Sequence, residues 1–148
     1  MQKAILGLGC FWEPEKKFSL IKGVTKTEVG YCGGNSPITT YKEVCSDKTN
    51  HAEVVNIEFD ENIITYEKIV RLFFEMHDPT TLNRQGPNAG SQYRSEIFYN
   101  SEEQREIAKR ILKELSKRFN NKIVTKISKV LNYCKAEEYH QKYFQKKN

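Results

Sequence analysis

The sequence contains no close-set pair of cysteines. Its four cysteines, Cys10, Cys32, Cys45 and Cys134, form no Cys-x-x-Cys motif. The usual zinc sites need such pairs, so a zinc site of this kind is not expected. A disulfide framework is not expected in a cytosolic chain of this size. The thiols are therefore buried structural groups, with room for one that is reactive.

A long apolar run is also missing. The first apolar stretch, Ala4 to Leu8, is too short for the apolar core of a signal peptide. No segment approaches the roughly 20 apolar residues of a membrane span. We therefore expect a cytoplasmic protein without a membrane partner. The 148 residues contain no repeat and are expected to form a single domain over 1–148.

The positive charge is unevenly distributed. The net charge is +5, and the excess of Lys and Arg lies in residues 101–148. A basic segment can bind nucleic acid. It is also typical of a solvated helix face that needs no partner. We adopt the second interpretation and expect no nucleic-acid partner, with a nucleic-acid-binding module as the alternative.

Apolar periodicity predicts alternating strands and helices. Strands are expected over 3–8, 24–31, 51–60, 95–100 and 124–130, and helices over 10–21, 65–77, a long segment after Ser101, and 137–146. Two consecutive strands between helices favour an α+β domain, and a ferredoxin-like α/β sandwich with a mixed or antiparallel sheet fits best. Residues 35–50 and 78–94 are expected to be loops. The second is long enough to suggest a functional loop.

Cys10 lies where the first strand meets the first helix. Pro14 is tolerated only in a first helical turn, so the helix begins within a residue or two of Cys10. Unpaired N–H groups and the helix dipole favour a thiolate there. We therefore predict a lowered pKa for Cys10. The alternative is a small buried residue at a junction between elements.

Glu53 has the same strand parity as Val55, Ile57 and Phe59. Its carboxyl group should therefore point to the face that these three residues bury. Burial raises the pKa of a carboxyl group above about 4.3, and a protonated Glu can act as a general acid near neutral pH. The alternative is a Glu at the first position of a strand that turns out to solvent.

Other polar residues near loops are less informative. Tyr41 and Tyr93 could each hold an oxygen by a hydrogen bond, although packing is the ordinary role of a single tyrosine. The segment from His51 to Glu53 is similar to the H-x-E of zinc deaminases, but the second motif of that site is missing. A cysteine–histidine pair of the thiol-protease type would need His51 or His140, and no protease signature supports it.

Five segments in this order match one family. They are GCFW (9–12), GYCGG (30–34), TYKEVCSDKTNHAEVV (40–55), RQGPNAGSQYRS (84–95) and AEEYHQ (136–141). The sequence resembles the A-class peptide methionine sulfoxide reductases, which reduce the S epimer of methionine sulfoxide. The resemblance runs from about Lys3 to Phe144. It implies a ferredoxin-like fold and thiol chemistry that requires no metal or organic cofactor.

The resemblance implies roles for individual residues. Cys10 would be the nucleophile that attacks the sulfoxide sulfur, leaving a sulfenic acid that a second thiol must clear. Phe11 and Trp12 would form the apolar pocket for the substrate methyl group. Glu53 would protonate the sulfoxide oxygen. The two tyrosines that would hydrogen bond to this oxygen are Tyr41 and Tyr93.

Two departures from the family pattern affect these expectations. Asn88 stands where many members carry Asp, so it would play a supporting part at most. No cysteine follows Cys134, although many members keep a resolving cysteine in the tail. Cys134 is the first candidate for that role and Cys32 the second, while Cys45 is interpreted as structural. Direct reduction by an external thiol is the alternative.

The implied partners follow from this chemistry. The substrates would be oxidised proteins or peptides that contain methionine sulfoxide. Thioredoxin, glutaredoxin or a small thiol would serve as reductant. The enzyme is expected to be a monomer. A cysteine hydrolase that uses Cys10 stays as a further alternative function.

Overall fold

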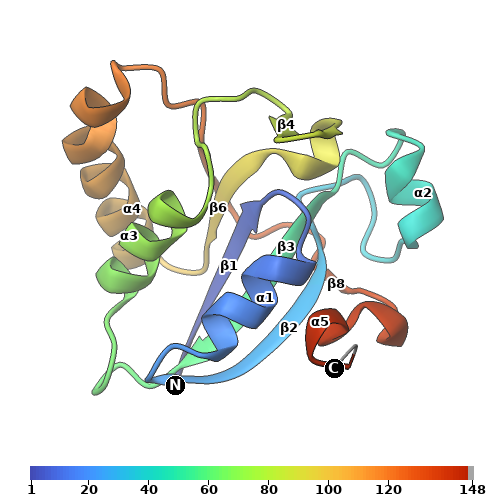
Figure 1. Cartoon of the computed structure of the whole chain (residues 1–148), viewed down its shortest axis with the longest axis horizontal. Helices are drawn as coiled ribbons and strands as arrows, with labels where there is room; N and C mark the ends of the chain where they lie inside the picture. Colours follow the sequence, from blue (N-terminus) through green and yellow to red (C-terminus); the bar gives the residue numbers. More distant parts are fainter. Residues whose placement is uncertain (147–148) are drawn as a thin grey trace.

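A six-stranded sheet forms the centre of the molecule, with strand order β7-β6-β1-β3-β2-β8 (Figure 1). The computed structural model describes residues 1–146. Its sheet strands are β1 (Gln2–Leu8), β2 (Val24–Cys32), β3 (Ala52–Phe59), β6 (Ser95–Tyr99), β7 (Lys126–Lys129) and β8 (Cys134–Lys135). The helices are α1 (Trp12–Ser19), α2 (Tyr41–Cys45), α3 (Tyr66–Met76), α4 (Glu102–Leu115) and α5 (Tyr143–Lys146). Single-turn 3₁₀ segments are η1 (Ser91–Tyr93), η2 (Ser116–Phe119) and η3 (Glu138–His140).

The inner four strands have the ferredoxin-like arrangement. The chain runs β1-α1-β2-β3-α3-β6, and the strands lie in the order β6-β1-β3-β2 with every neighbouring pair antiparallel. Two further strands extend this core. β7 pairs parallel with β6 at one edge, and β8 pairs antiparallel with β2 at the other. The predicted α+β fold with a mixed sheet is confirmed.

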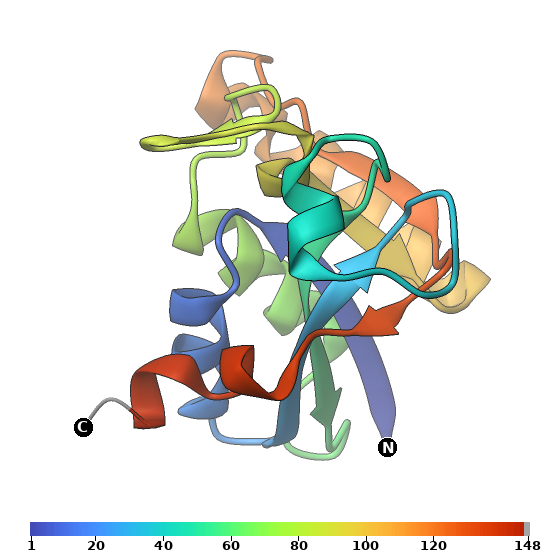
Figure 2. The ribbon, with the colours of Figure 1, turned by 90° about the vertical axis from the view of Figure 1, so that its right-hand side faces the viewer.

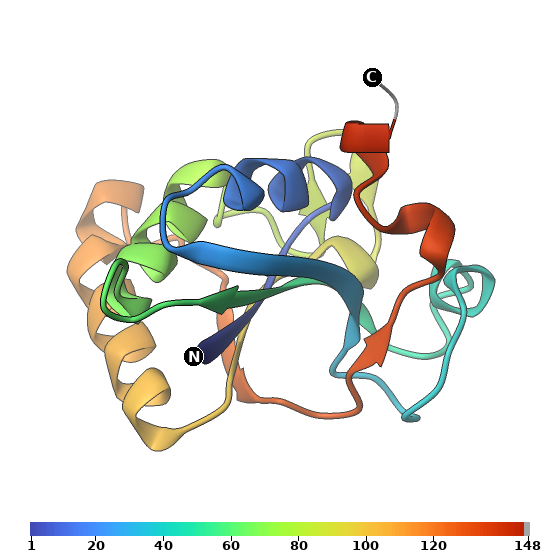
Figure 3. The same cartoon turned by 90° about the horizontal axis from the view of Figure 1, so that it is seen from below.

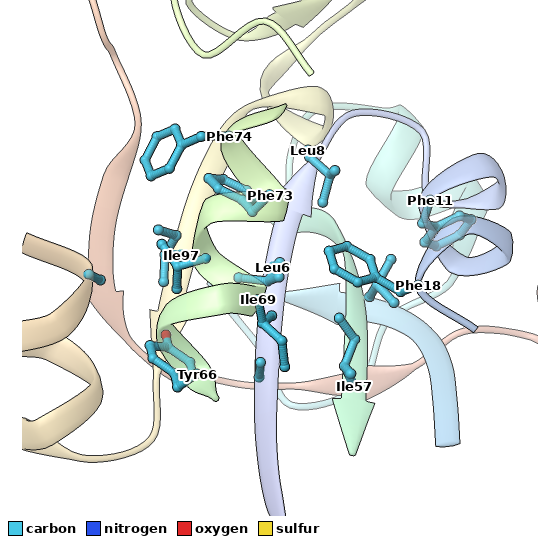
Figure 4. Packing of buried hydrophobic residues seen from close by; sticks show 14 of the residues in the cluster. Leu6, Leu8, Phe11, Phe18, Ile57, Tyr66, Ile69, Phe73, Phe74 and Ile97 are labelled. Carbon is cyan, nitrogen blue, oxygen red and sulfur yellow. The ribbon is translucent and has the colours of Figure 1, made fainter. Parts of the chain in front are cut away.

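The two faces of the sheet are covered differently. α1 and α3 lie side by side on one face, here called the front face (Figure 3). The large core forms beneath these helices, where side chains such as Leu6, Phe18, Ile57 and Phe73 meet (Figure 4). The opposite, back face carries a smaller apolar cluster of Ile5, Cys32, Ala52, Val54 and Phe98. Because successive residues of a strand point to opposite faces, each strand feeds both clusters.

Strand register places three residues in one row across the sheet. Tyr31 of β2 lies directly opposite Glu53 of β3 on one side and Cys134 of β8 on the other. Directly paired residues share a face. Tyr31 belongs to the front-face core, so Glu53 and Cys134 also belong to the front face.

Helix starts agree closely with the sequence. Ser101 caps α4 by accepting a hydrogen bond from the Gln104 N–H, as its capping box predicts. Thr65 caps α3 in the same way. The first helix is shorter than expected and begins at Trp12, which leaves Cys10 outside the helix and Pro14 within its first turn.

The C-terminal segment differs from the continuous helix that was predicted over 137–146. It contains η3 and the four-residue α5, which lies beside α1 (Figure 2). The side-chain amide of Gln141 pairs with both the N–H and the C=O of Val29, each at 2.9 Å. Lys142 follows with a φ of 53°. Fixing the chain to β2 at Gln141 therefore interrupts the helix.

The two predicted loops contain short elements. Residues 35–50 include α2, whose cap is Thr40. Residues 78–94 include a hairpin of β4 (Arg84–Gln85) and β5 (Asn88–Ala89), followed by η1. These elements are too short to show an apolar period, so sequence patterns cannot reveal them.

Candidate active site

Cys10 sits in the connection between β1 and α1, half-buried. The preceding Gly9 has a φ of +97°, and a Cβ there would lie 2.8 Å from the Gln85 side chain, so only glycine fits this turn. The pKa of Cys10 is raised to about 11. Burial is the main cause, and the charges of Glu53 and Glu13 add to it, while the Trp12 N–H opposes it. The predicted lowering is wrong, because desolvation outweighs the helix start.

Glu53 lies one residue into β3 and points into the protein, as its parity predicts. Its side chain is 2% exposed. The N–H of Phe11 approaches Oε1 at 3.4 Å, and Gln92 Nε2 donates to Oε2 at 2.9 Å. Burial raises the pKa of Glu53 to about 7, although both hydrogen bonds act in the opposite direction. The carboxyl group therefore exchanges its proton near neutral pH.

Tyr41 and Tyr93 come from two separate short elements and meet near Glu53. Tyr41 opens α2 and Tyr93 ends η1. Burial raises the pKa of both phenols, and Tyr93 also senses the charges of Glu53 and Cys10. A hydrogen bond between the two tyrosine side chains has the opposite effect and lowers the pKa of Tyr93. Both hydroxyl groups are therefore neutral near pH 7 and lie within electrostatic range of the carboxyl group. Each has a single O–H, so the bond between them must open before both can donate to a substrate.

The two aromatic residues after Cys10 have different surroundings. Phe11 is only 1% exposed and packs between Tyr31 and His140, at ring-centre distances of 5.8 and 5.2 Å. It therefore does not line an open pocket. Trp12 is partly exposed and stacks face to face on Tyr143 at 3.7 Å, while its Nε1 donates to His140 Nδ1 at 3.1 Å.

A cavity of about 340 Å³ opens beside Cys10. Its walls come from the start of α1, the end of α3, the β4–β5 hairpin and α5: among others Cys10, Trp12, His77, Gln85, Asn88 and Phe144. Its volume suits a methionine side chain with part of its backbone. Glu53 and the two tyrosines are not among the residues that line it. Cys10 is thus the residue at which the open cavity and the buried acid meet.

Comparison with known proteins identifies the family. Residues 2–148 match the family model described as peptide methionine sulfoxide reductase. The chain belongs to this family. Peptide methionine sulfoxide reductase MsrA of Pelagibacter ubique is 61% identical over 99% of this chain and 100% of that protein. The chain is accordingly an oxidoreductase that reduces methionine sulfoxide by thiol chemistry.

Solved structures of family members share this fold. Mxr1 from Saccharomyces cerevisiae in reduced form superposes with a TM-score of 0.91 at 37% identity, covering 98% of this chain and 84% of that chain. Mxr1 in complex with Trx2 superposes with a TM-score of 0.68 at 25% identity, covering 96% and 84%. The fold of this reductase is thus closer to the reduced form than to the form bound to Trx2.

The remaining cysteines of the reductase lie in three different places. Cys134 is on the front face at the sheet edge, half-buried, with its Sγ 3.7 Å from the Thr39 carbonyl oxygen. Cys32 is 0% exposed on the back face, where its Sγ hydrogen bonds to the Leu131 carbonyl oxygen and burial raises its pKa to about 11. The structure therefore does not bring Cys32 together with Cys10. Cys45 is exposed at the end of α2.

Several residues that support the site were not predicted from the sequence. Gln92 holds Glu53, and His140 and Tyr143 hold Trp12. Glu137 accepts hydrogen bonds from the Tyr31 hydroxyl at 2.8 Å and from the Tyr41 N–H at 2.9 Å. Three of the four lie in the GSQYRS and AEEYHQ segments, so the family motifs marked them without giving them a role.

Two further findings concern residues 1–146. No group of three or more His, Cys, Asp or Glu side chains within this range is arranged to hold a metal ion. No helix among these residues is long and apolar enough to cross a membrane.

Proposed function

We propose that Cys10 is the nucleophile of this reductase and that Glu53 transfers a proton from Cys10 to the sulfoxide oxygen. The observation that carries the proposal is that the thiol and the carboxyl group are neighbours and that the thiol binds a proton more tightly than the carboxyl group does. The pKa of Glu53 is about 7 and that of Cys10 is about 11, and the charge of Glu53 contributes to the second value. Above pH 7 the pair therefore holds one proton, on the sulfur.

This proton is the one that the reaction needs. Cys10 Sγ attacks the sulfoxide sulfur as a thiolate, so its proton must first leave. The Glu53 carboxylate accepts this proton and passes it to the sulfoxide oxygen as general acid. The S–O bond of the substrate then breaks and its oxygen passes to Cys10. Methionine is released in reduced form, and Cys10 is oxidised to a sulfenic acid.

Neighbouring side chains orient the substrate. Tyr41 and Tyr93 donate hydrogen bonds to the sulfoxide oxygen, which gains negative charge as sulfur is attacked. The face of Trp12 in the cavity packs against the substrate methyl group. The two tyrosines lie outside the cavity on the side of Glu53, so the S epimer is selected as the one that turns its methyl group to Trp12 and its oxygen to the tyrosines.

Phe11 does not contact the substrate. It supports the site from the protein interior, where its N–H contacts Glu53 and its ring packs between Tyr31 and His140. Asn88 offers an uncharged polar group at the cavity wall.

The sulfenic acid is then cleared by a second thiol. Attack by a thiol on Cys10-SOH forms a disulfide and releases water. Cys134 lies two strand spacings of about 4.8 Å from Glu53, so the two-residue strand β8 must leave the sheet edge before it can reach Cys10. A thioredoxin is the favoured reductant of the resulting disulfide, because Mxr1 has been solved in complex with Trx2. A glutaredoxin or a small thiol that reduces Cys10 directly is the alternative.

We further propose that the enzyme acts as a cytoplasmic monomer on oxidised proteins and peptides. All groups assigned to the reaction come from one chain, so no second copy is needed to complete the site. The open cavity admits a side chain from an unfolded or exposed segment. Size-exclusion chromatography with light scattering checks the monomer, and a dimer would contradict it.

One experiment tests the assignment of the thiols. Reduced enzyme is mixed with one equivalent of methionine-S-sulfoxide without reductant, and the protein is analysed by mass spectrometry after trapping with dimedone. We expect one methionine per enzyme and either a dimedone adduct on Cys10 or a Cys10–Cys134 disulfide. Methionine formed with Cys10 unmodified, or equal turnover of the R epimer, would contradict the proposal.

A further inference from the structure

Gln92 is a buried amide that contacts the acid from the side away from Phe11. It lies in η1 directly before Tyr93 and is 6% exposed. Its Nε2 donates to Glu53 Oε2 at 2.9 Å and lies 3.5 Å from Cys45 Sγ. A single side-chain nitrogen thus faces both the carboxyl group and a second thiol.

We propose that Gln92 is a positioning residue that determines which oxygen of Glu53 carries the transferred proton. The proposal rests on the role of Glu53 stated above. An amide N–H can only donate, so it favours the form of Glu53 in which Oε2 is the carbonyl oxygen, the stronger acceptor. The Phe11 N–H is also only a donor, but its contact with Oε1 is longer, at 3.4 Å against 2.9 Å for the Gln92 bond to Oε2, so the Gln92 bond decides. The acidic hydrogen then sits on Oε1, the oxygen that faces the residue next to Cys10.

The orientation of the amide is itself fixed by its surroundings. Cys45 Sγ is a weak acceptor, and its thiol is hydrogen bonded to the Tyr41 side chain. With both neighbours accepting, the nitrogen end of Gln92 must face them. The reversed amide would place its oxygen against the Glu53 carboxylate, where the two would repel each other. Cys45, interpreted as structural from the sequence, therefore helps to orient the amide.

The backbone around Gln92 is held by one arginine. Arg94 Nη1 donates to the Ser91 carbonyl oxygen at 2.9 Å and Nη2 to the Asn50 carbonyl oxygen at 3.0 Å. Its Nε pairs with Glu96 at 2.6 Å in a nearly buried ion pair. Arg94 thus ties η1 to the segment that leads into β3, and this contact maintains the spacing between Gln92 and Glu53.

The titration of Glu53 can be followed because its neighbours do not titrate near pH 7. The groups that face it are Cys10 from the β1–α1 connection, Tyr31 from β2, Tyr41 from α2 and Tyr93 from η1, and the pKa of each is raised. The thiol and phenols therefore stay neutral through pH 8. The hydrogen bond from Gln92 lowers the pKa of Glu53. Removing this bond should raise it.

The test compares Gln92→Leu with a matched control, Gln104→Leu. Gln104 is also a buried amide, 3% exposed, but it binds Lys3 and Asn100 at the far end of the sheet. Single-turnover methionine formation is measured from pH 5 to 9 over a range of sulfoxide concentrations. In the wild type the rate should rise as the pH passes the pKa of Glu53, because the reaction needs Cys10 and Glu53 to hold a single proton between them.

We expect the maximal single-turnover rate of Gln92→Leu to fall by roughly 10-fold or more, with half-saturation changed by less than about 2-fold. In the plot of rate against pH, the rise in rate (the rising limb) should move to higher pH in Gln92→Leu. In Gln104→Leu both the maximal rate and the pH of this rising limb should stay as in the wild type. Cys45→Ala, which removes an exposed group, should move the limb in the same direction by less. An unshifted limb in Gln92→Leu, or a rate equal to that of the wild type, would overturn the proposal.

A third variant separates this proposal from the one on which it rests. Glu53→Gln should abolish the limb near pH 7. If the limb persists in Glu53→Gln, the role of Glu53 is wrong. If it disappears there but is unmoved in Gln92→Leu, only the role of Gln92 is wrong. Circular dichroism shows whether Gln92→Leu folds. If it does not fold, the pH at which the rate of Cys45→Ala rises is measured instead. If this pH is the same as in the wild type, the proposal is overturned.

Discussion

Cys10 on the front side of the sheet and Cys32 on its back face are two thiols with the same proton affinity. Burial raises the pKa of each to about 11. Cys10 has a carboxyl group with a pKa of about 7 beside it and an open cavity in front. Cys32 has a carbonyl oxygen and apolar side chains around it and no exposed surface. If Cys10 is the nucleophile, as proposed, its reactivity comes from a neighbour that can take its proton, and not from a low pKa of its own.

The largest effect should come from removing each thiol in turn. Cys10→Ser should lose turnover by at least roughly 10⁴-fold, because the nucleophile is gone. Cys32→Ala should keep turnover within about 2-fold and lose about 1 kcal/mol of unfolding free energy through the small void it leaves. Turnover with dithiothreitol and urea unfolding measure the two effects. Strong loss of turnover in folded Cys32→Ala would break the comparison.

The next effect concerns the neighbour that takes the proton. Glu53→Gln should slow the single-turnover rate at pH 8 by about 10²- to 10⁴-fold, since an amide can neither accept nor deliver the proton. The residual rate should rise with pH towards the pKa of Cys10.

Glu96 provides the back-face control for Glu53→Gln. It is 4% exposed and bonds to Arg94 and to the Ser128 hydroxyl. Glu96→Gln should lose stability, because a neutral amide replaces the charged partner of Arg94 in this nearly buried ion pair. It should keep the rise in rate near pH 7, because the bonds from Arg94 to the Ser91 and Asn50 carbonyl oxygens, which hold Gln92 beside Glu53, do not involve Glu96. A Glu53→Gln rate equal to the wild-type rate would contradict the role of Glu53.

A third effect appears in stability rather than rate. The pKa of Glu53 is about 7 when folded and about 4.3 when unfolded. A raised folded pKa stabilises the protein below the unfolded value, and this contribution is lost as pH rises to 7. The wild type should therefore lose about 3 kcal/mol of unfolding free energy relative to Glu53→Gln between pH 4 and pH 8. Urea unfolding at both pH values checks this. A parallel pH dependence of the two proteins would show that Glu53 is not buried.

The smallest effect should come from the residues around Trp12. Tyr143→Ala removes the ring stacked on Trp12 and should raise KM for a sulfoxide peptide by roughly 2- to 10-fold, as one aromatic pair contributes about 0.5–1.5 kcal/mol. Tyr133→Phe, which removes a hydroxyl bonded to Glu28 on the back face, should leave KM unchanged. Steady-state kinetics measure both. If KM rises in Tyr133→Phe and stays unchanged in Tyr143→Ala, the assignment of substrate binding to Trp12 on the front face would be contradicted.

Long periodic segments were predictable because their burial pattern is local. The alternation in β3 and the capping box at Ser101 led to correct elements and to the inward direction of Glu53. Short elements were not predictable, because α2, β4, β5 and β8 depend on distant partners. The expected terminal helix was wrong for the same reason, since the amide of Gln141 binds β2.

Within the site, the sequence by itself determined which residues stand beside Cys10 along the chain and which face of β3 carries Glu53. The family motifs added the tyrosines, whose roles remain predictions. Only the tertiary structure decided the proton affinities, because the desolvation that sets the pKa of Cys10 and Glu53 comes from elements far apart in sequence. It also decided that Phe11 is buried while Trp12 faces the cavity, and that Cys32 faces away from Cys10, since both follow from how the helices and strands pack.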